Sequence, residues 1–108
     1  MARHQIKPIS MNNAYRGRRF LTADYKAYKQ ELMYLLPKLK IPQGRLFLRL
    51  TVGYSSKGSD IDNCIKPFLD ILQEKYEFND NRVYLLEVAK EDVKKGEEFI
   101  DWDISGLD

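Results

Sequence analysis

The 108-residue sequence predicts an α+β fold, a single domain in which a mixed β-sheet packs against two main helices. Residues 45–54 alternate between apolar and polar side chains, as in a strand with one buried face. Residues 22–35 and 61–75 instead repeat apolar side chains at helical spacing. With two further strand-like segments near the end, the expected order is β-α-β-α-β-β. We expect residues 1–108 to form one domain, because this length suffices for one core and not for two.

The N-terminal half begins with a predicted edge strand from His4 to Ser10, since Pro8 is tolerated at an edge. A loop rich in Asn and Arg follows at 11–20. Thr22 is a plausible N-cap of the first helix, which Pro37 ends. The apolar stripe expected to face the core or a dimer interface is Leu21, Tyr25, Tyr28, Leu32 and Leu35.

The C-terminal half continues this pattern. The strand at 45–54 places Leu46, Leu48, Leu50, Val52 and Tyr54 on one face and Phe47, Arg49 and Thr51 on the other. A second helix runs to about Lys75, with Pro67 in its early turns. Residues 82–90 and 99–104 read as strands, and the turn between them predicts that they form an antiparallel hairpin.

Charge is divided unevenly along the chain. Residues 1–50 hold eleven Lys and Arg against two acids, whereas residues 51–108 hold seven against fourteen. Such asymmetry favours a basic surface for a polyanion beside an acidic centre for a metal. The alternative is that both halves carry ordinary solvated faces.

Composition excludes several classes. No apolar run approaches the ~20 residues of a membrane span, and the N-terminus lacks a signal-peptide pattern. A single cysteine, Cys64, permits no internal disulfide, and one Cys with one His makes a structural zinc site implausible. We therefore expect a cytoplasmic protein without a membrane partner.

Two carboxylates, Asp60 and Asp62, stand one residue apart where the second helix begins. Two such charges ~4 Å apart repel by roughly 4 kcal/mol at an effective dielectric of ~20, and a divalent cation removes that repulsion. Magnesium binds one or two carboxylates together with waters and phosphate oxygens. Lys66 adds a positive charge suited to phosphate. Asp80, after the helix, is a third candidate, because loops at element ends often converge on one site.

Each of these acids also has a structural interpretation. Asp60 or Asp62 could cap the helix. Asp70 could form a surface pair with Lys66, four residues before it. Asp80 lies in an Asn-Asp-Asn cluster typical of turns.

The candidate DNA-binding residues lie mainly in the basic half. Arg16, Arg18 and Arg19 could grip phosphates through their bidentate guanidinium groups, and Tyr15 could stack on an unpaired base. Lys26 and Lys29 fall on the polar side of the first helix, where DNA contact and plain solvation are both open. Lys57 stands in the loop before the acidic pair, where an ordinary loop is the alternative.

The pattern DxDNxxKxxxD, followed by an Asp-containing turn and a Val-rich strand, resembles the RusA family of Holliday junction resolvases. Its members here are Asp60, Asp62, Asn63, Lys66 and Asp70. The basic Tyr-Arg segment at 12–22 also resembles the N-terminal region of that family. The resemblance spans roughly Pro8 to Lys90.

The resemblance implies a magnesium-dependent endonuclease, with Mn²⁺ as an alternative ion, that acts in DNA recombination and repair. Such an enzyme works as a homodimer and cuts four-way DNA junctions at symmetrically placed phosphodiesters. The implied roles are metal binding for Asp60, Asp62 and Asp80, and assistance in catalysis for Lys66. The family often has an acidic pair before the later strand, and here Asn79 replaces its first member.

Two rival functions remain open from the residues alone. One is a non-catalytic DNA-binding or regulatory module in which the acids only balance the basic half. The other is a magnesium enzyme acting on a nucleotide or sugar-phosphate. The absence of a Gly-rich phosphate loop from the sequence counts against the second.

Overall fold

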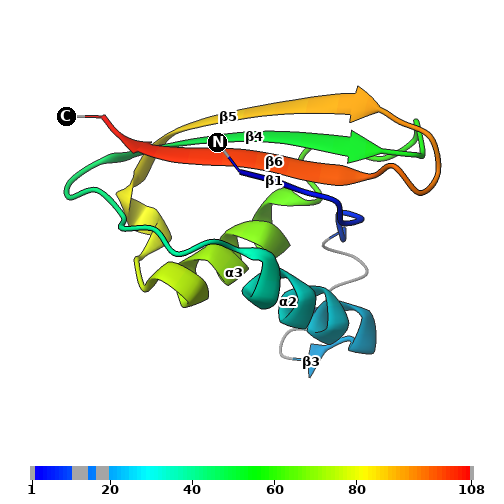
Figure 1. The fold of residues 1–108 in the computed structure, drawn as a ribbon, viewed down its shortest axis with the longest axis horizontal. Coiled ribbons are helices and arrows are strands. Elements are labelled where there is room, and N and C mark those ends of the chain that lie inside the picture. Colours follow the sequence, from blue (N-terminus) through cyan, green and yellow to red (C-terminus); the bar gives the residue numbers. More distant parts are fainter. Residues whose placement is uncertain (1, 11–14, 17–19, 108) are drawn as a thin grey trace.

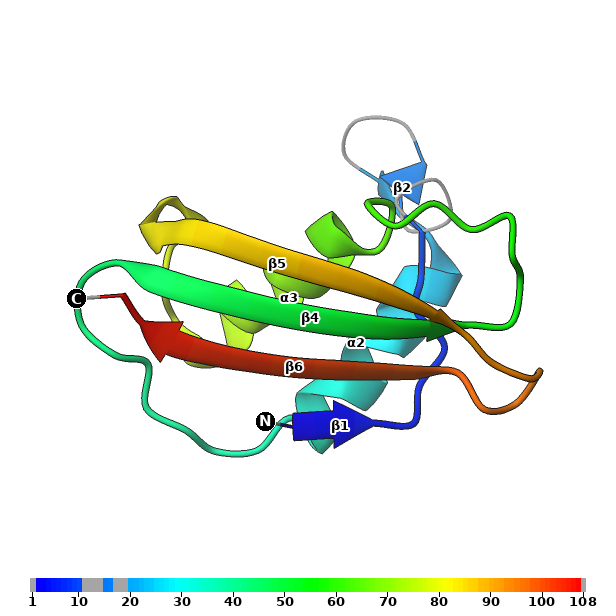
Figure 2. The ribbon, with the colours of Figure 1, turned by 90° about the horizontal axis from the view of Figure 1, so that it is seen from above.

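The computed structural model describes residues 2–10, 15, 16 and 20–107, and these form one α+β domain with the predicted element order. A four-stranded mixed sheet, ordered β1-β6-β4-β5, carries helices α2 and α3 on one face (Figures 1 and 2). The sheet strands are β1 (Ala2–His4), β4 (Leu46–Tyr54), β5 (Val83–Asp92) and β6 (Phe99–Gly106). The other elements are α2 (Ala23–Leu35), α3 (Ile65–Tyr76), the short 3-10 helix η1 (Asp80–Arg82), and a small antiparallel pair of β2 (Tyr15–Arg16) and β3 (Phe20–Leu21).

Strand β4 lies at the centre of the domain, as its alternating pattern predicts. Leu46, Leu48, Leu50 and Val52 are at most 2% exposed, and they belong to the same core cluster as the buried residues of α2 and α3. The intervening residues, including the exposed Arg49, point to the opposite face of the sheet. The predicted orientation of this strand is confirmed.

Strands β5 and β6 do not form the hairpin predicted from the sequence. They lie on either side of β4, with β5 parallel to it and β6 antiparallel to it. Neighbouring strands are ~4.8 Å apart, so the link between β5 and β6 has to cross only ~10 Å to pass β4. Residues 93–98 span that distance easily. The apolar central strand thereby gains a hydrogen-bonded neighbour on both edges.

Two predicted boundaries also shift. The first strand is Ala2–His4 rather than 4–10, because β1 pairs only with Ile100–Trp102 of β6 and the chain turns where Ile6 N donates to His4 O at 3.0 Å. The second helix begins at Ile65 rather than at residue 61, so Ile61 lies outside it and is 42% exposed.

The helices pack on each other through several polar contacts. Thr22 caps α2 as predicted, since its side chain accepts from Tyr25 N at 3.1 Å. Lys75 Nζ donates to Met33 O at 3.0 Å, and Tyr76 OH donates to Pro37 O at 2.6 Å. These bonds fix α3 against α2. In the described part of the chain, no helix is long and apolar enough to cross a membrane.

Candidate active site

The acidic pair lies in the loop that leaves the end of β4 and enters α3. Asp60 and Asp62 are both exposed there. The N-cap position of α3 belongs to Cys64, which makes no side-chain capping bond. The alternative in which Asp60 or Asp62 caps the helix is therefore wrong, and neither carboxylate bonds to the N-terminal amides of α3 as a cap.

Backbone and side-chain bonds hold this loop in consecutive turns. Asn63 N donates to Asp60 O at 3.4 Å, and Ile65 N donates to Asp62 O at 3.2 Å. The Asn63 side chain donates to Asp60 Oδ2 at 3.2 Å. From β5, Lys90 Nζ donates to Ser59 O at 2.8 Å. The acidic loop is thus tied both to the start of α3 and to the sheet.

A pocket of about 290 Å³ opens beside Asp60. Lys7 contributes a positive charge to its lining, and Glu98 a negative one. The Ser55 hydroxyl donates to Glu98 at 2.7 Å, and this bond lowers the pKa of Glu98. The pocket lining therefore combines the carboxylate of Asp60 with the Lys7 ammonium and with hydroxyl and amide groups that can donate hydrogen bonds.

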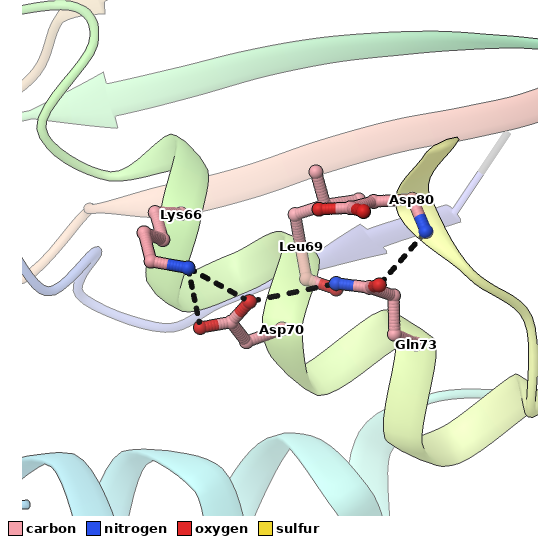
Figure 3. Close-up of polar contacts among 5 residues, drawn as sticks. All are labelled: Lys66, Leu69, Asp70, Gln73 and Asp80. Atoms are coloured by element: carbon pink, nitrogen blue, oxygen red, sulfur yellow. Dashed lines mark hydrogen bonds and ion pairs between the residues drawn. The ribbon is translucent and has the colours of Figure 1, made fainter. Parts of the chain in front are cut away.

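On α3, Lys66 forms an ion pair with Asp70 at 3.4 Å, as the sequence spacing indicates (Figure 3). Gln73 continues this row, because its Nε2 donates to Asp70 Oδ1 at 3.4 Å. The other end of the same amide, Oε1, accepts from Asp80 N at 2.8 Å. Gln73 therefore links Asp80 to the side of α3 that carries Lys66 and Asp70.

The segment that carries Asp80 is held at several points. The Asn79 side chain accepts from Asn81 N at 2.9 Å and so caps η1. Asn79 stands where the family often has an acid, and it therefore has a structural role here. Arg82 Nε donates to Gly44 O at 3.0 Å, and its Nη2 donates to Pro42 O. In Figure 3 the Asp80 side chain extends from η1 over the α3 turn at Leu69.

The structure does not assemble a group of three carboxylates. Among residues 2–10, 15–16 and 20–107, no three Asp, Glu, His or Cys side chains lie close enough together to hold a metal ion. Asp60 and Asp62 precede α3 and Asp80 follows it, and a helix of 12 residues is ~18 Å long. The loops at the two ends of one helix thus start far apart.

Comparison with known protein families identifies the family of this chain. A family model described as Endodeoxyribonuclease RusA matches residues 5–100. The chain belongs to the RusA family. RusA-family proteins are endodeoxyribonucleases that resolve Holliday junctions in recombination and repair, and this identifies the chain as an enzyme on branched DNA. Family membership favours the nuclease over both rival functions. No curated protein matches the chain.

RusA-family nucleases are metal-dependent, and the donor set of this chain suits a hard cation. Within the described residues, no Lys or Arg forms an ion pair with Asp60, Asp62 or Asp80. Two exposed carboxylates on one turn match the one or two protein ligands with which magnesium is usually held. The exposed pair Asp60 and Asp62 therefore has the donor chemistry that a divalent metal requires.

The predicted DNA-binding residues of this RusA-family chain have different outcomes. Arg18 and Arg19 lie outside the described residues, as do the side chains of Tyr15 and Arg16. Lys26 and Lys57 are exposed and available to solvent or DNA. Lys29 instead forms an ion pair with Glu74 of α3 at 2.5 Å.

Two residues near the site are absent from the sequence-based set. Gln73 bridges Asp70 and Asp80, and its position three residues after Asp70 is a helical spacing that could have revealed it. Lys90 supports the acidic loop through Ser59 O, across 31 residues of sequence. No local pattern indicates that contact, because it depends on where β5 enters the sheet.

Proposed function

We propose that this RusA-family chain hydrolyses phosphodiesters of four-way DNA junctions with Mg²⁺ as its cofactor. The observation that carries the proposal is the exposed pair Asp60 and Asp62 at the head of α3, with Lys66 just inside the helix. These carboxylates neither cap the helix nor pair with a described basic residue. An acidic pair that lacks a basic partner among the described residues and stands beside a lysine suits a metal and a phosphate together.

Asp60 and Asp62 would hold the metal, with Mn²⁺ as an alternative ion, and Asp80 would complete the site once metal or DNA binding brings its segment closer to them. A bound divalent metal activates water and stabilises charge on the leaving oxygen. The Lys66 ammonium would contact the scissile phosphate. Its present partner is Asp70, and exposed ion pairs of this kind contribute only ~0–1 kcal/mol, so a DNA phosphate can displace the carboxylate.

The basic half of the chain would bind the DNA backbone. Tyr15, Arg16, Arg18 and Arg19 form the proposed contact segment, and Lys26 and Lys57 add exposed charge. Arginine can form two hydrogen bonds to phosphate oxygens at once, and such contacts do not depend on the base sequence. Lys29 contributes less under this proposal, because Glu74 already neutralises it.

We infer that the active form is a homodimer, because paired nicks on symmetry-related strands need two equivalent sites. Strand β5 supports this inference. It is one of the two edge strands of the described four-stranded sheet, and Tyr84, Leu85 and Leu86 on it are 67%, 46% and 42% exposed. Analytical ultracentrifugation at micromolar concentration, with and without junction DNA, tests the dimer. A monomer under both conditions would contradict it.

The decisive experiment incubates a labelled synthetic four-way junction with the protein, with Mg²⁺ or with a chelator. We expect paired nicks only with Mg²⁺. Asp62→Asn should bind the junction with parental affinity and cut it at least about 100-fold more slowly, because removing one charge-stabilising group typically costs that much.

Asp24→Asn serves as the matched control, since Asp24 is an exposed acid in the first turn of α2. It should cut at the parental rate. Retained cutting by Asp62→Asn at ordinary Mg²⁺ concentration would reject the assignment. Cutting in the presence of the chelator would reject the metal requirement.

A further inference from the structure

A buried pair of side chains, Tyr54 and Cys64, lies beneath the acidic loop. Tyr54 ends β4 and is 9% exposed, and Cys64 directly precedes α3 and is fully buried. Their hydroxyl and thiol groups are hydrogen-bonded to each other. The thiol also donates to Ile61 O at 3.7 Å, so the Tyr54 hydroxyl is the donor to the Cys64 sulfur.

The two hydrogen bonds, from the Tyr54 hydroxyl to Cys64 Sγ and from the Cys64 thiol to Ile61 O, form a relay that joins the two ends of the acidic loop. The bond between Tyr54 and Cys64 closes the segment 55–63, which contains both carboxylates. The bond from the thiol reaches Ile61, the residue between Asp60 and Asp62. A fixed carbonyl at that residue restricts the backbone on either side of it. The relay therefore acts on the part of the loop from which both carboxylates project.

Both groups of this pair are buried. Burial raises the pKa of the Tyr54 hydroxyl, and the nearby charges of Asp62 and Asp60 raise it further. Burial also raises the pKa of the Cys64 thiol. The contribution of the thiol here is geometric, through its hydrogen bond to Ile61 O.

We propose that Tyr54 and Cys64 are positioning residues that hold the 60–62 segment in the form in which Asp60 and Asp62 bind a divalent cation. The proposal rests on the proposed metal role of these two carboxylates. It assigns a purpose to two buried groups, a phenol and a thiol, that take no part in the proposed hydrolysis.

The test compares Tyr54→Phe with Tyr28→Phe. Tyr28 lies in the same core and is 6% exposed, and its hydroxyl has no hydrogen-bond partner in the described structure. Both variants lose one buried hydroxyl, yet only Tyr54→Phe breaks the relay. The readouts are amide hydrogen exchange at Asn63 and Ile65, Mn²⁺ and Mg²⁺ affinity by calorimetry, and junction cutting across a Mg²⁺ series.

Tyr54→Phe should accelerate exchange at Asn63 and Ile65 and weaken metal affinity, each by about fivefold, the equivalent of one net hydrogen bond. The maximal cutting rate at saturating Mg²⁺ should change less than the half-saturating Mg²⁺ concentration. Tyr28→Phe should leave all of these values at the parental level. A general loss of stability would instead affect exchange throughout the core.

Cys64→Ser provides a second variant, because serine keeps a hydrogen-bonding group of shorter reach. It should fall between the parent and Cys64→Ala in metal affinity. Equal exchange and equal metal affinity in Tyr54→Phe and Tyr28→Phe would overturn the proposal, as would a Cys64→Ala variant with parental metal affinity. If the parent itself binds the metal but cuts no junction, the proposed function fails while these comparisons still decide the positioning role.

Discussion

The Lys66 ammonium lies 3.4 Å from the Asp70 carboxylate, one turn farther along α3. The two side chains are 56% and 31% exposed, so water screens the pair. Gln73 holds the same carboxylate from the other side. Asp70 therefore keeps Lys66 on one side of the helix without binding it tightly.

Lys66→Met and Asp70→Asn should separate these roles. Lys66→Met should slow cutting by about 100-fold while junction binding stays within about threefold, because the lost charge acts mainly on the reacting phosphate. Asp70→Asn should change cutting by less than about threefold and the free energy of unfolding by less than ~1 kcal/mol. Single-turnover cleavage and fluorescence anisotropy measure both effects. Parental cutting by Lys66→Met would remove this lysine from the site.

Gln73→Met should disturb the placement of Asp80. The substitution keeps an unbranched helix former and removes the acceptor that Asp80 N uses at 2.8 Å. We expect a loss of ~1 kcal/mol in the free energy of unfolding, the net worth of one hydrogen bond, and a higher Mg²⁺ requirement for cutting. Gln30→Met on the exposed side of α2 is the control. If both variants show the same Mg²⁺ dependence, Gln73 does not position Asp80.

His4 should make stability depend on pH. Trp102 Nε1 donates to His4 Nε2 at 2.9 Å, so the ring accepts as a neutral imidazole. Burial lowers the pKa of His4 below its ordinary value of 6.5, although Asp101 opposes this. The unfolded chain therefore binds a proton at a higher pH than the folded chain does. The stability that His4 contributes is present above pH 6.5 and is lost as the pH falls through the folded-state pKa.

Thermal unfolding at pH 7.5 and pH 5 measures this effect. The parent should lose more stability over that interval than His4→Gln, in which an amide oxygen can replace the neutral imidazole as acceptor and does not titrate. Carboxylates elsewhere contribute equally to both proteins and cancel in the comparison. Equal losses in the two proteins would show that His4 does not titrate on unfolding.

Gly53→Ala should destabilise the sheet. A Cβ atom at Gly53 would collide with the ring of Phe99, which is only 2% exposed on β6. Forcing such an atom into a packed core typically costs about 1–3 kcal/mol. Gly106→Ala is the matched control within a strand, because its nearest neighbour would be Pro42 Cβ at an ordinary 3.5 Å. Urea denaturation should show a lower midpoint for Gly53→Ala alone.

Local patterns determined most of the fold. The alternation at 46–54 defines a strand with one buried face, and the Thr22 cap and Pro37 bound the first helix. The same reasoning predicted the Lys66–Asp70 pair, because contacts four residues apart follow from helix geometry alone. The motif around Asp60 and Asp62 also predicted the family, because its residues lie within one short segment of the sequence.

Only the tertiary structure decided which distant segments meet. The antiparallel order of β5 and β6 is compatible with a hairpin or with β4 between them, and the choice depends on how the apolar β4 gains two neighbours. Likewise, sequence spacing cannot show that Asp80 folds back onto Gln73 of α3, or that Tyr54 closes the loop onto Cys64. Local propensity acts over a few residues, whereas these relationships arise from strand order and packing across the whole domain.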